Sequence, residues 1–180
     1  MRRDHAPSAA ALMTSYCAGD ASAFRALHTL VAPRVLAYLV KMTRDRVLAA
    51  DLAQQTFMKI HRARHHYIAG ADPLPWIMSI AHHTFIDEVR KRGSSVVVLS
   101  STPSLPEPAT EHAPVDRARV DAALAALAEL PSRQRQAVVL ITLEGHSAAE
   151  AAQIAGTTAG TMRVRAHRGC EALRTALGAT

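Results

Sequence analysis

Aromatic residues, cysteines and long apolar runs are all scarce in this chain of 180 residues. Phe, Tyr and Trp make up only 4% of the sequence, although hydrophobic residues, many of them alanine, reach 49%. Small cores between helices fit that composition better than one large sheet core. The single strand-like run, Val96 to Leu99, has no visible partner in the sequence. We therefore predict an all-α protein made of two small helical domains.

The two cysteines, Cys17 and Cys170, lie far apart in the sequence and exclude a disulfide framework. We expect them to be buried small hydrophobic residues, and a redox switch is the less favoured alternative. No apolar run approaches the roughly 18–20 residues of a membrane span, and the N-terminal segment lacks the apolar core of a signal peptide. These absences predict a cytoplasmic protein without membrane insertion.

Motifs of enzymatic chemistry are also missing: the chain has no HExxH, no CxxC and no Gly-rich phosphate loop. Ten histidines invite a search for a metal site. His61 and His65 could share one helix face, but two arginines and no acidic residue lie between them. We expect no metal, no cofactor and no catalytic residue, so an enzyme is the disfavoured alternative.

Positive charge is divided into two blocks. Residues 1–92 carry a net charge of +6 and residues 117–180 a net charge of +3, whereas residues 93–116 carry −3. Basic blocks favour a polyanionic partner through counterion release. The segment from Gly93 to Pro114 holds four of the nine prolines, and its 22 residues reach about 70 Å when fully extended. The predicted domains are therefore 1–92 and 117–180, joined by a Pro-rich acidic linker, 93–116.

Helical periodicity and turn residues divide these domains further. Pro33 is expected to kink or split the second helix, and a loop is expected at 69–75. In the second domain, Ser132 is expected to cap a helix, and Val120, Leu124 and Leu127 should lie on one side of the helix before it. The predicted helices span residues 9–18, 21–43, 46–67, 76–92, 115–130 and 133–143.

The segment Ser147 to Arg174 has the parts of a helix-turn-helix DNA reader. Ser147 and Glu150 form a capping box, Gly156 ends a short helix, and Thr158 caps the next one, from about 159 to 177. Met162, Ala166 and Leu173 fall on its buried side, together with Cys170 or Ala172. Another side carries Arg163, Val164, His167 and Arg168, where a recognition helix needs its base contacts. An ordinary basic amphipathic helix is the alternative.

The predicted third helix, residues 46–67, carries two stripes of side chains on different sides. The side chains of one stripe, with Phe57 beside them, should face the core: Leu52, Thr56, Ile60, Ala63 and Tyr67. Asp51, Gln54, Gln55, Met58 and Arg62 recur on the other side, and such a surface suits a partner helix because Met adapts to apolar contacts. A plain solvated face is the alternative that spacing alone favours.

The order of these segments resembles the extracytoplasmic-function (ECF, group IV) sigma factors of bacterial RNA polymerase. AADLAQQTF (Ala49 to Phe57) and WIMSIAHHTFIDEVRKR (Trp76 to Arg92) resemble their region 2. LAELPSRQRQAVVL (Leu127 to Leu140) and the Ser147–Arg174 segment resemble their region 4. The resemblance covers nearly the whole chain, including the proline-rich connector.

The resemblance implies a factor that directs promoter recognition, DNA melting and transcription initiation at stress- or signal-responsive genes. Its partners would be promoter DNA, the β′ coiled coil and β flap of core RNA polymerase, and an anti-sigma factor. The matching polymerase-binding residues are Asp51, Gln54, Gln55, Phe57 and Met58. Those for the −10 element are His65, His66, Tyr67, His83, Asp87, Arg90, Lys91 and Arg92. Those for the −35 element are Thr158, Thr161, Arg163, Val164, Arg165, His167 and Arg168.

Three positions depart from the family pattern. Gln55 stands where Glu is usual, His83 where Asn is usual, and Gly169-Cys170 where a small residue and an Arg are usual. We expect these departures to affect specificity and affinity. A stand-alone repressor or activator is the alternative function, and it would bind duplex DNA tightly without polymerase.

Overall fold

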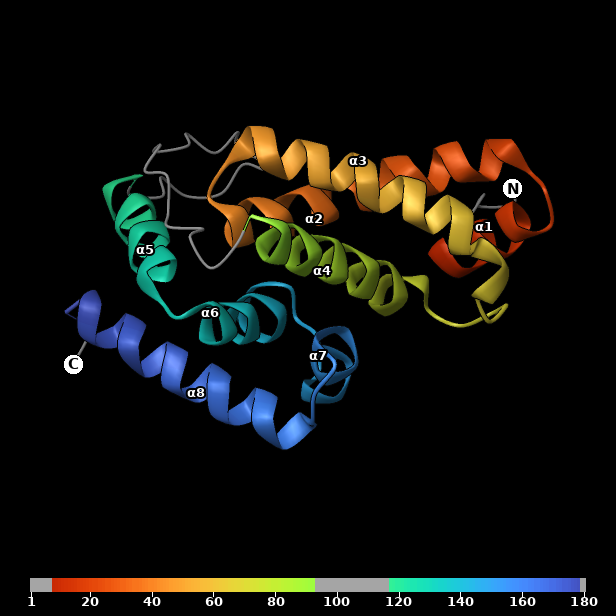
Figure 1. The fold of residues 1–180 in the computed structure, drawn as a ribbon. Coiled ribbons are helices and arrows are strands. Elements are labelled where there is room, and N and C mark those ends of the chain that lie inside the picture. The colour runs from red at the N-terminus through yellow and green to blue at the C-terminus, as the bar shows by residue number, and fades with distance from the viewer. Residues whose placement is uncertain (1–7, 93–116, 179–180) are drawn as a thin grey trace, which may run out of the picture.

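The computed structural model describes residues 8–92 and 117–178, and every regular element within these ranges is a helix. The prediction of an all-α protein is confirmed. The predicted linker, with the run Val96 to Leu99, lies outside the described residues. The elements form two groups (Figure 1) and are α1 (Ala9–Cys17), α2 (Ala21–Thr43), α3 (Arg46–Ala63), η1 (Arg64–His66), α4 (Pro73–Lys91), α5 (Arg117–Glu129), α6 (Ser132–Val138), η2 (Val139–Leu143), α7 (Ala148–Ala155) and α8 (Ala159–Ala176).

Helices α1 to α4 each begin at a residue whose side-chain oxygen accepts a hydrogen bond from the first turn. For α4 this residue is Asp72, which accepts from the Leu74 amide at 3.0 Å. The expected start at 76 is therefore wrong. Pro73 and Pro75 lie in the first turn, where the missing amide hydrogen costs no helical hydrogen bond.

Helix α2 runs without interruption through Pro33, so the expected split is not found. Val31, Val35 and Leu39 are buried in the core shared with α1, α3 and α4. By length and composition alone, α2 is the one helix of the described ranges that could cross a membrane. A core helix of a soluble protein passes the same test, so this is weak support for a membrane span.

The expected end of the third helix at Tyr67 is also wrong, because α3 ends at Ala63 and a 3₁₀ turn follows. Leu52, Thr56 and Ile60 of the predicted inner stripe are buried. Phe57, Ala63 and Tyr67 are only half-buried, and Tyr67 lies beyond the end of the helix.

In the second group, α6 packs along α8, and α7 packs against α8. Ser132 is the first residue of α6 and does not cap it, since Pro131 occupies the N-cap position. Val120, predicted on the same side of α5 as Leu127, is 38% exposed, whereas Leu127 is buried. The spacing of apolar residues in α5 is a poor guide to burial, because only the C-terminal end of this helix reaches the core.

Gly169 lies where α8 meets α6. A Cβ atom built on it would approach Val138 Cγ2 to 2.6 Å, closer than real Cβ contacts. Gly169→Ala is therefore expected to lower the free energy of unfolding by about 1–3 kcal/mol, because Val138 is stiff and α6 has to move. Urea denaturation measures this change. Gly160→Ala is the control, since its nearest atom is 4.0 Å away and alanine favours helix. Equal stability of the two variants would contradict the tight contact.

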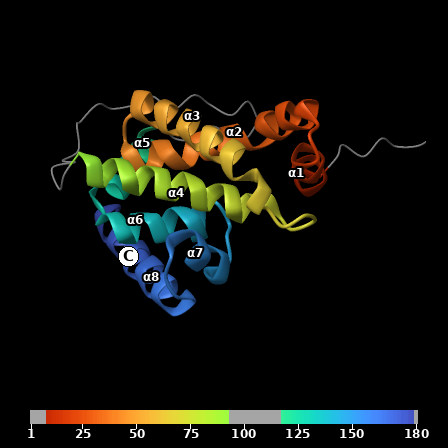
Figure 2. The same cartoon turned by 45° about the vertical axis from the view of Figure 1, so that its right-hand side comes forward.

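The two groups of helices pack against each other. Figures 1 and 2 both show α6 and α7 lying along α4, and α2 also contacts α5 and α6. This packing was not predicted from the sequence.

Candidate functional surfaces

An apolar groove runs between α2 and α3. From α3, it is lined by Gln54, Phe57 and Met58, and the Met58 side chain is half exposed. From α2, the Phe24, His28 and Leu36 side chains line the opposite wall. The rings of His28 and Phe57 lie 4.4 Å apart between their centroids and form part of the floor. A groove of this kind accepts the apolar side of a helix.

The predicted outer stripe of α3 is split by this groove. Gln54, Met58 and Arg62 of the stripe line the groove, whereas Asp51 and Gln55 are exposed beside it. Phe57, which was expected beside the inner stripe, also lines the groove. The residues that the sequence reasoning missed are those on α2. Thr29, Ala32 and Leu36 recur at spacings of three and four, which was the available signal.

The turn between α3 and α4 holds three of the predicted residues. His65 and His66 are exposed, with ring centroids 4.0 Å apart. Tyr67 is half-buried against Trp76, with ring centroids 5.8 Å apart, and its hydroxyl donates to the carbonyl of Ala71. The contact between the Tyr67 and Trp76 rings holds one side of the turn in place. The imidazole rings of His65 and His66 are exposed at the edge of the turn.

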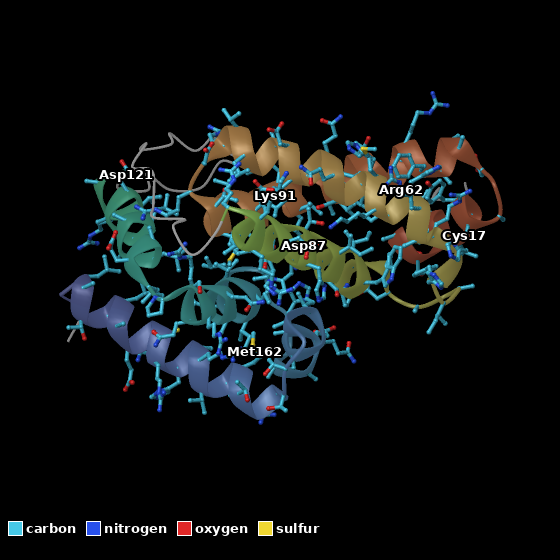
Figure 3. The ribbon with its side chains drawn as sticks, viewed as in Figure 1. Cys17, Arg62, Asp87, Lys91, Asp121 and Met162 are labelled. Carbon is cyan, nitrogen blue, oxygen red and sulfur yellow. The ribbon has the colours of Figure 1, made fainter. Side chains whose placement is uncertain are left out.

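Helix α4 presents a polar, largely basic face (Figure 3). Asp87 and Lys91 are exposed on it, together with His83, Arg90 and Arg92. The Lys59 ammonium group donates to Asp87 at 3.0 Å, and this hydrogen bond is the main cause that lowers the pKa of the Asp87 carboxyl. His83 Nδ1 lies 2.7 Å from the carbonyl oxygen of Ser79, so the ring is held on its own helix.

The predicted helix-turn-helix is confirmed in its local geometry. Ser147 and Glu150 form the capping box, and Gly156 takes the left-handed conformation with φ of 60°. Thr158 caps α8 by accepting from the Thr161 amide at 3.2 Å. Because the hydroxyls of Thr158 and Thr161 are 2.8 Å apart, they form one polar pair at the start of α8.

Helix α8 divides as the sequence predicts. Met162 and Ala166 are buried against the neighbouring helices. Four residues are exposed on the outer side, and Arg165 is half-buried. The exposed four are Arg163, Val164, His167 and Arg168. His167 Nδ1 lies 3.3 Å from Glu171, one turn farther along.

Known proteins resemble this chain over both groups of helices. The family models Sigma-70 region 2 and Sigma-70, region 4 match residues 27–95 and 121–173. The RNA polymerase sigma factor CarQ of Myxococcus xanthus is 35% identical over 169 residues, which are 89% of this chain and 92% of that protein. The ECF RNA polymerase sigma factor SigF of Caulobacter vibrioides is 32% identical over 172 residues, covering 91% and 90%. The chain belongs to the ECF sigma factors.

Solved structures agree with this ECF sigma factor in fold. The sigma factor RpoE of Bartonella quintana, in complex with the anti-sigma factor NepR, is 28% identical with a TM-score of 0.74, over 86% of this chain and 96% of that one. CnrH, in complex with the cytosolic domain of CnrY, is 20% identical with a TM-score of 0.71, over 96% and 99%. The group of helices α1–α4 is called region 2, and the group α5–α8 is called region 4.

Proposed function

We propose that this ECF sigma factor binds core RNA polymerase in the cytoplasm and directs it to promoters of stress- or signal-responsive genes, with all catalysis supplied by the polymerase. One observation carries the proposal. A single chain exposes both an apolar groove suited to a partner helix, between α2 and α3, and a basic helix-turn-helix face, on α8.

The polymerase-binding surface in this proposal is the groove together with Asp51 and Gln55 on its rim. Met58 and Phe57 supply apolar contact to the β′ coiled coil, and Gln54 supplies hydrogen-bond donors and acceptors. Region 4 contacts the β flap.

The promoter is read at two places in this proposal. Arg163, Val164, His167 and Arg168 of α8 read the −35 element in the major groove, and the Thr158–Thr161 pair donates to a phosphate. Region 2 captures single-stranded bases of the −10 element between the turn at His65–Tyr67 and the basic end of α4. Base capture offsets an unstacking cost of a few kcal/mol.

An anti-sigma factor is the further partner that we propose. The sigma factor RpoE of Bartonella quintana, which has a similar fold, was solved in complex with the anti-sigma factor NepR. A regulator that covers the groove would compete directly with the polymerase.

Reconstitution with core RNA polymerase on a library of promoter fragments tests this function. Mapped transcripts should start at defined positions, and aligned templates should share two upstream elements. Tight duplex binding without polymerase, combined with no transcription, would instead support a stand-alone repressor or activator.

Arg168→Ala is expected to weaken holoenzyme binding at −35 sequences by about 1–3 kcal/mol, because a bidentate base contact is lost. Competition binding with promoter fragments measures the change. Arg174→Ala is the matched control: this exposed arginine lies about 9 Å farther along the same helix. Equal losses from both variants would mean that Arg168 contributes only general positive charge.

A further inference from the structure

The turn between α3 and α4, which comprises η1 and residues 67–72, has few anchors of its own. Of residues 67–72, Tyr67 alone is half-buried, and its ring packs on Trp76. The His65 and His66 side chains are exposed, and the Ile68 side chain is 77% exposed. A segment with so few buried contacts needs support from a neighbouring element to keep one shape.

Helix α1 supplies contacts to this turn from outside. Figures 1 and 2 both show α1 at the end of region 2 where the turn lies. Thr14 Oγ1 accepts a hydrogen bond from the Gly70 amide at 3.3 Å. The same hydroxyl donates to the Ala10 carbonyl oxygen at 2.8 Å, so its hydrogen is used within α1 and its oxygen is left to accept from the turn. Thr14 therefore anchors the far end of the turn.

Two more residues of α1 hold the start of the turn. The Cys17 thiol (Figure 3) donates to the Arg64 carbonyl oxygen at 3.2 Å. Burial is the main cause that raises the pKa of this thiol, so it keeps the proton that it donates. The Tyr16 hydroxyl forms a hydrogen bond with His61 Nδ1, and the Arg64 guanidinium lies 5.9 Å from the centroid of the Tyr16 ring. Helix α1 thus contacts the chain just before η1, at the first residue of η1 and at Gly70.

We propose that α1 is a positioning element for promoter melting, in which Thr14, Tyr16 and Cys17 hold the turn at His65–Tyr67 in the shape that receives an unstacked base of the −10 element. This proposal rests on the proposed sigma function. The three side chains of α1 do not touch DNA in it and act through the turn.

A turn that is held in place before DNA arrives binds more tightly. A loose turn would lose conformational entropy when it receives the base, in addition to the cost of unstacking that base. The hydrogen bonds from α1 are already made in the free protein and remove part of that loss in advance. Loss of one of them should therefore weaken base capture and leave duplex binding by α8 unchanged.

Hydrogen exchange of the Gly70 amide, followed by NMR in the full free chain, tests whether α1 holds the turn. Thr14→Val keeps the shape of the side chain and removes the acceptor, so exchange of this amide should become about 3- to 10-fold faster. Thr14→Ser keeps the hydroxyl, and its exchange rate should stay within about twofold of the wild-type value. An unchanged rate in Thr14→Val overturns the proposed positioning.

Thr175→Val is the matched control for the loss of a threonine hydroxyl from a helix. The Thr175 hydroxyl donates to the Glu171 carbonyl oxygen at 3.1 Å, as that of Thr14 donates to Ala10. Thr175 is exposed near the end of α8 and belongs to region 4. This variant should keep the wild-type exchange rate at Gly70, and circular dichroism should show the wild-type helix content in every variant.

Base capture is measured by holoenzyme binding to two promoter fragments taken from the mapped transcripts. One fragment ends before the −10 element, and the other adds that element as a single-stranded tail. The ratio of the two affinities isolates the contribution of base capture. Thr14→Val should lower this ratio about 2- to 10-fold, because the turn is no longer held. Its affinity for core polymerase and for the fragment without the tail should equal that of the wild type, and Thr14→Ser should restore the ratio.

The two measurements separate the proposed positioning from the proposed function. Faster exchange at Gly70 with an unchanged ratio of affinities overturns the role of α1 in base capture. If the wild-type holoenzyme gains no affinity from the single-stranded tail, the proposed sigma function fails, and the role of α1 in base capture fails with it. Exchange at Gly70 needs no polymerase and still decides whether α1 holds the turn.

Discussion

Met58→Asp is expected to weaken binding of this sigma factor to core RNA polymerase by about 30- to 1000-fold, equivalent to about 2–4 kcal/mol. The Met58 side chain is 51% exposed and lines the groove between α2 and α3. A partner helix in that groove would cover it. An aspartate there would have to give up its hydration without a cationic partner, which costs several kcal/mol. Titration of labelled core enzyme measures the affinity.

Leu30→Asp is the matched control for Met58→Asp. Leu30 is 56% exposed on α2, but it does not line the groove. The same substitution there should leave polymerase affinity within about threefold of the wild-type value, since surface substitutions usually cost less than about 0.5 kcal/mol. Equal losses at the two positions would reject the groove as the docking surface.

The polar side chains at the groove, Asp51 on its rim and Gln54 in its lining, should matter less than its apolar lining. Asp51→Ala with Gln54→Ala removes exposed contacts and is expected to weaken polymerase binding by less than Met58→Asp does, while the fold stays intact. Unaltered co-purification of the double variant with core enzyme would exclude these two side chains from the interface.

The second large effect is on stability in acid. Burial is the main cause that lowers the pKa of His82 from 6.5 to about 4, and His83 adds to it. Between these values the unfolded chain binds the proton that the folded chain excludes, so stability is lost as pH falls. We expect the free energy of unfolding to decrease by about 3 kcal/mol between pH 6.5 and pH 4 on this account. Urea denaturation at a series of pH values measures the slope.

His82→Asn should flatten this pH dependence, because an amide keeps a hydrogen bond with Gln136 or Tyr38 and does not titrate. Burial also lowers the pKa of His146, which acts in the same direction, so part of the slope should remain. His65→Asn, at an exposed position, is the control and should keep the full slope. If the free energy of unfolding of His82→Asn depended on pH as steeply as that of the wild type, groups other than His82 would cause the loss of stability in acid.

Local signals in the sequence were enough to predict the helix-turn-helix. The capping box at Ser147 and Glu150, the left-handed Gly156 and the cap at Thr158 depend on residues within a few positions of each other. The two stripes of α3 were predictable for the same reason. Helical spacing identifies which side chains share a face, although it does not say what covers that face.

Contacts between distant segments were beyond the reach of the sequence. His82 and Gln136 are 54 positions apart, and neither residue carries a local mark of burial. The α2 wall of the groove was missed because its exposed side looks like any solvated face. Val120 shares a side of α5 with Leu127 and is nevertheless exposed, because periodicity ranks the faces of a helix and does not show that α5 meets the core only near Leu127.

The Glu144 carboxylate determines how much some of the cations behind the net charge of +6 can act on DNA. It pairs with two cations of region 2 at once, Arg34 and Lys41. These two cations therefore contribute less to the electrostatic field that attracts DNA phosphates to region 2 than a count of its basic residues suggests.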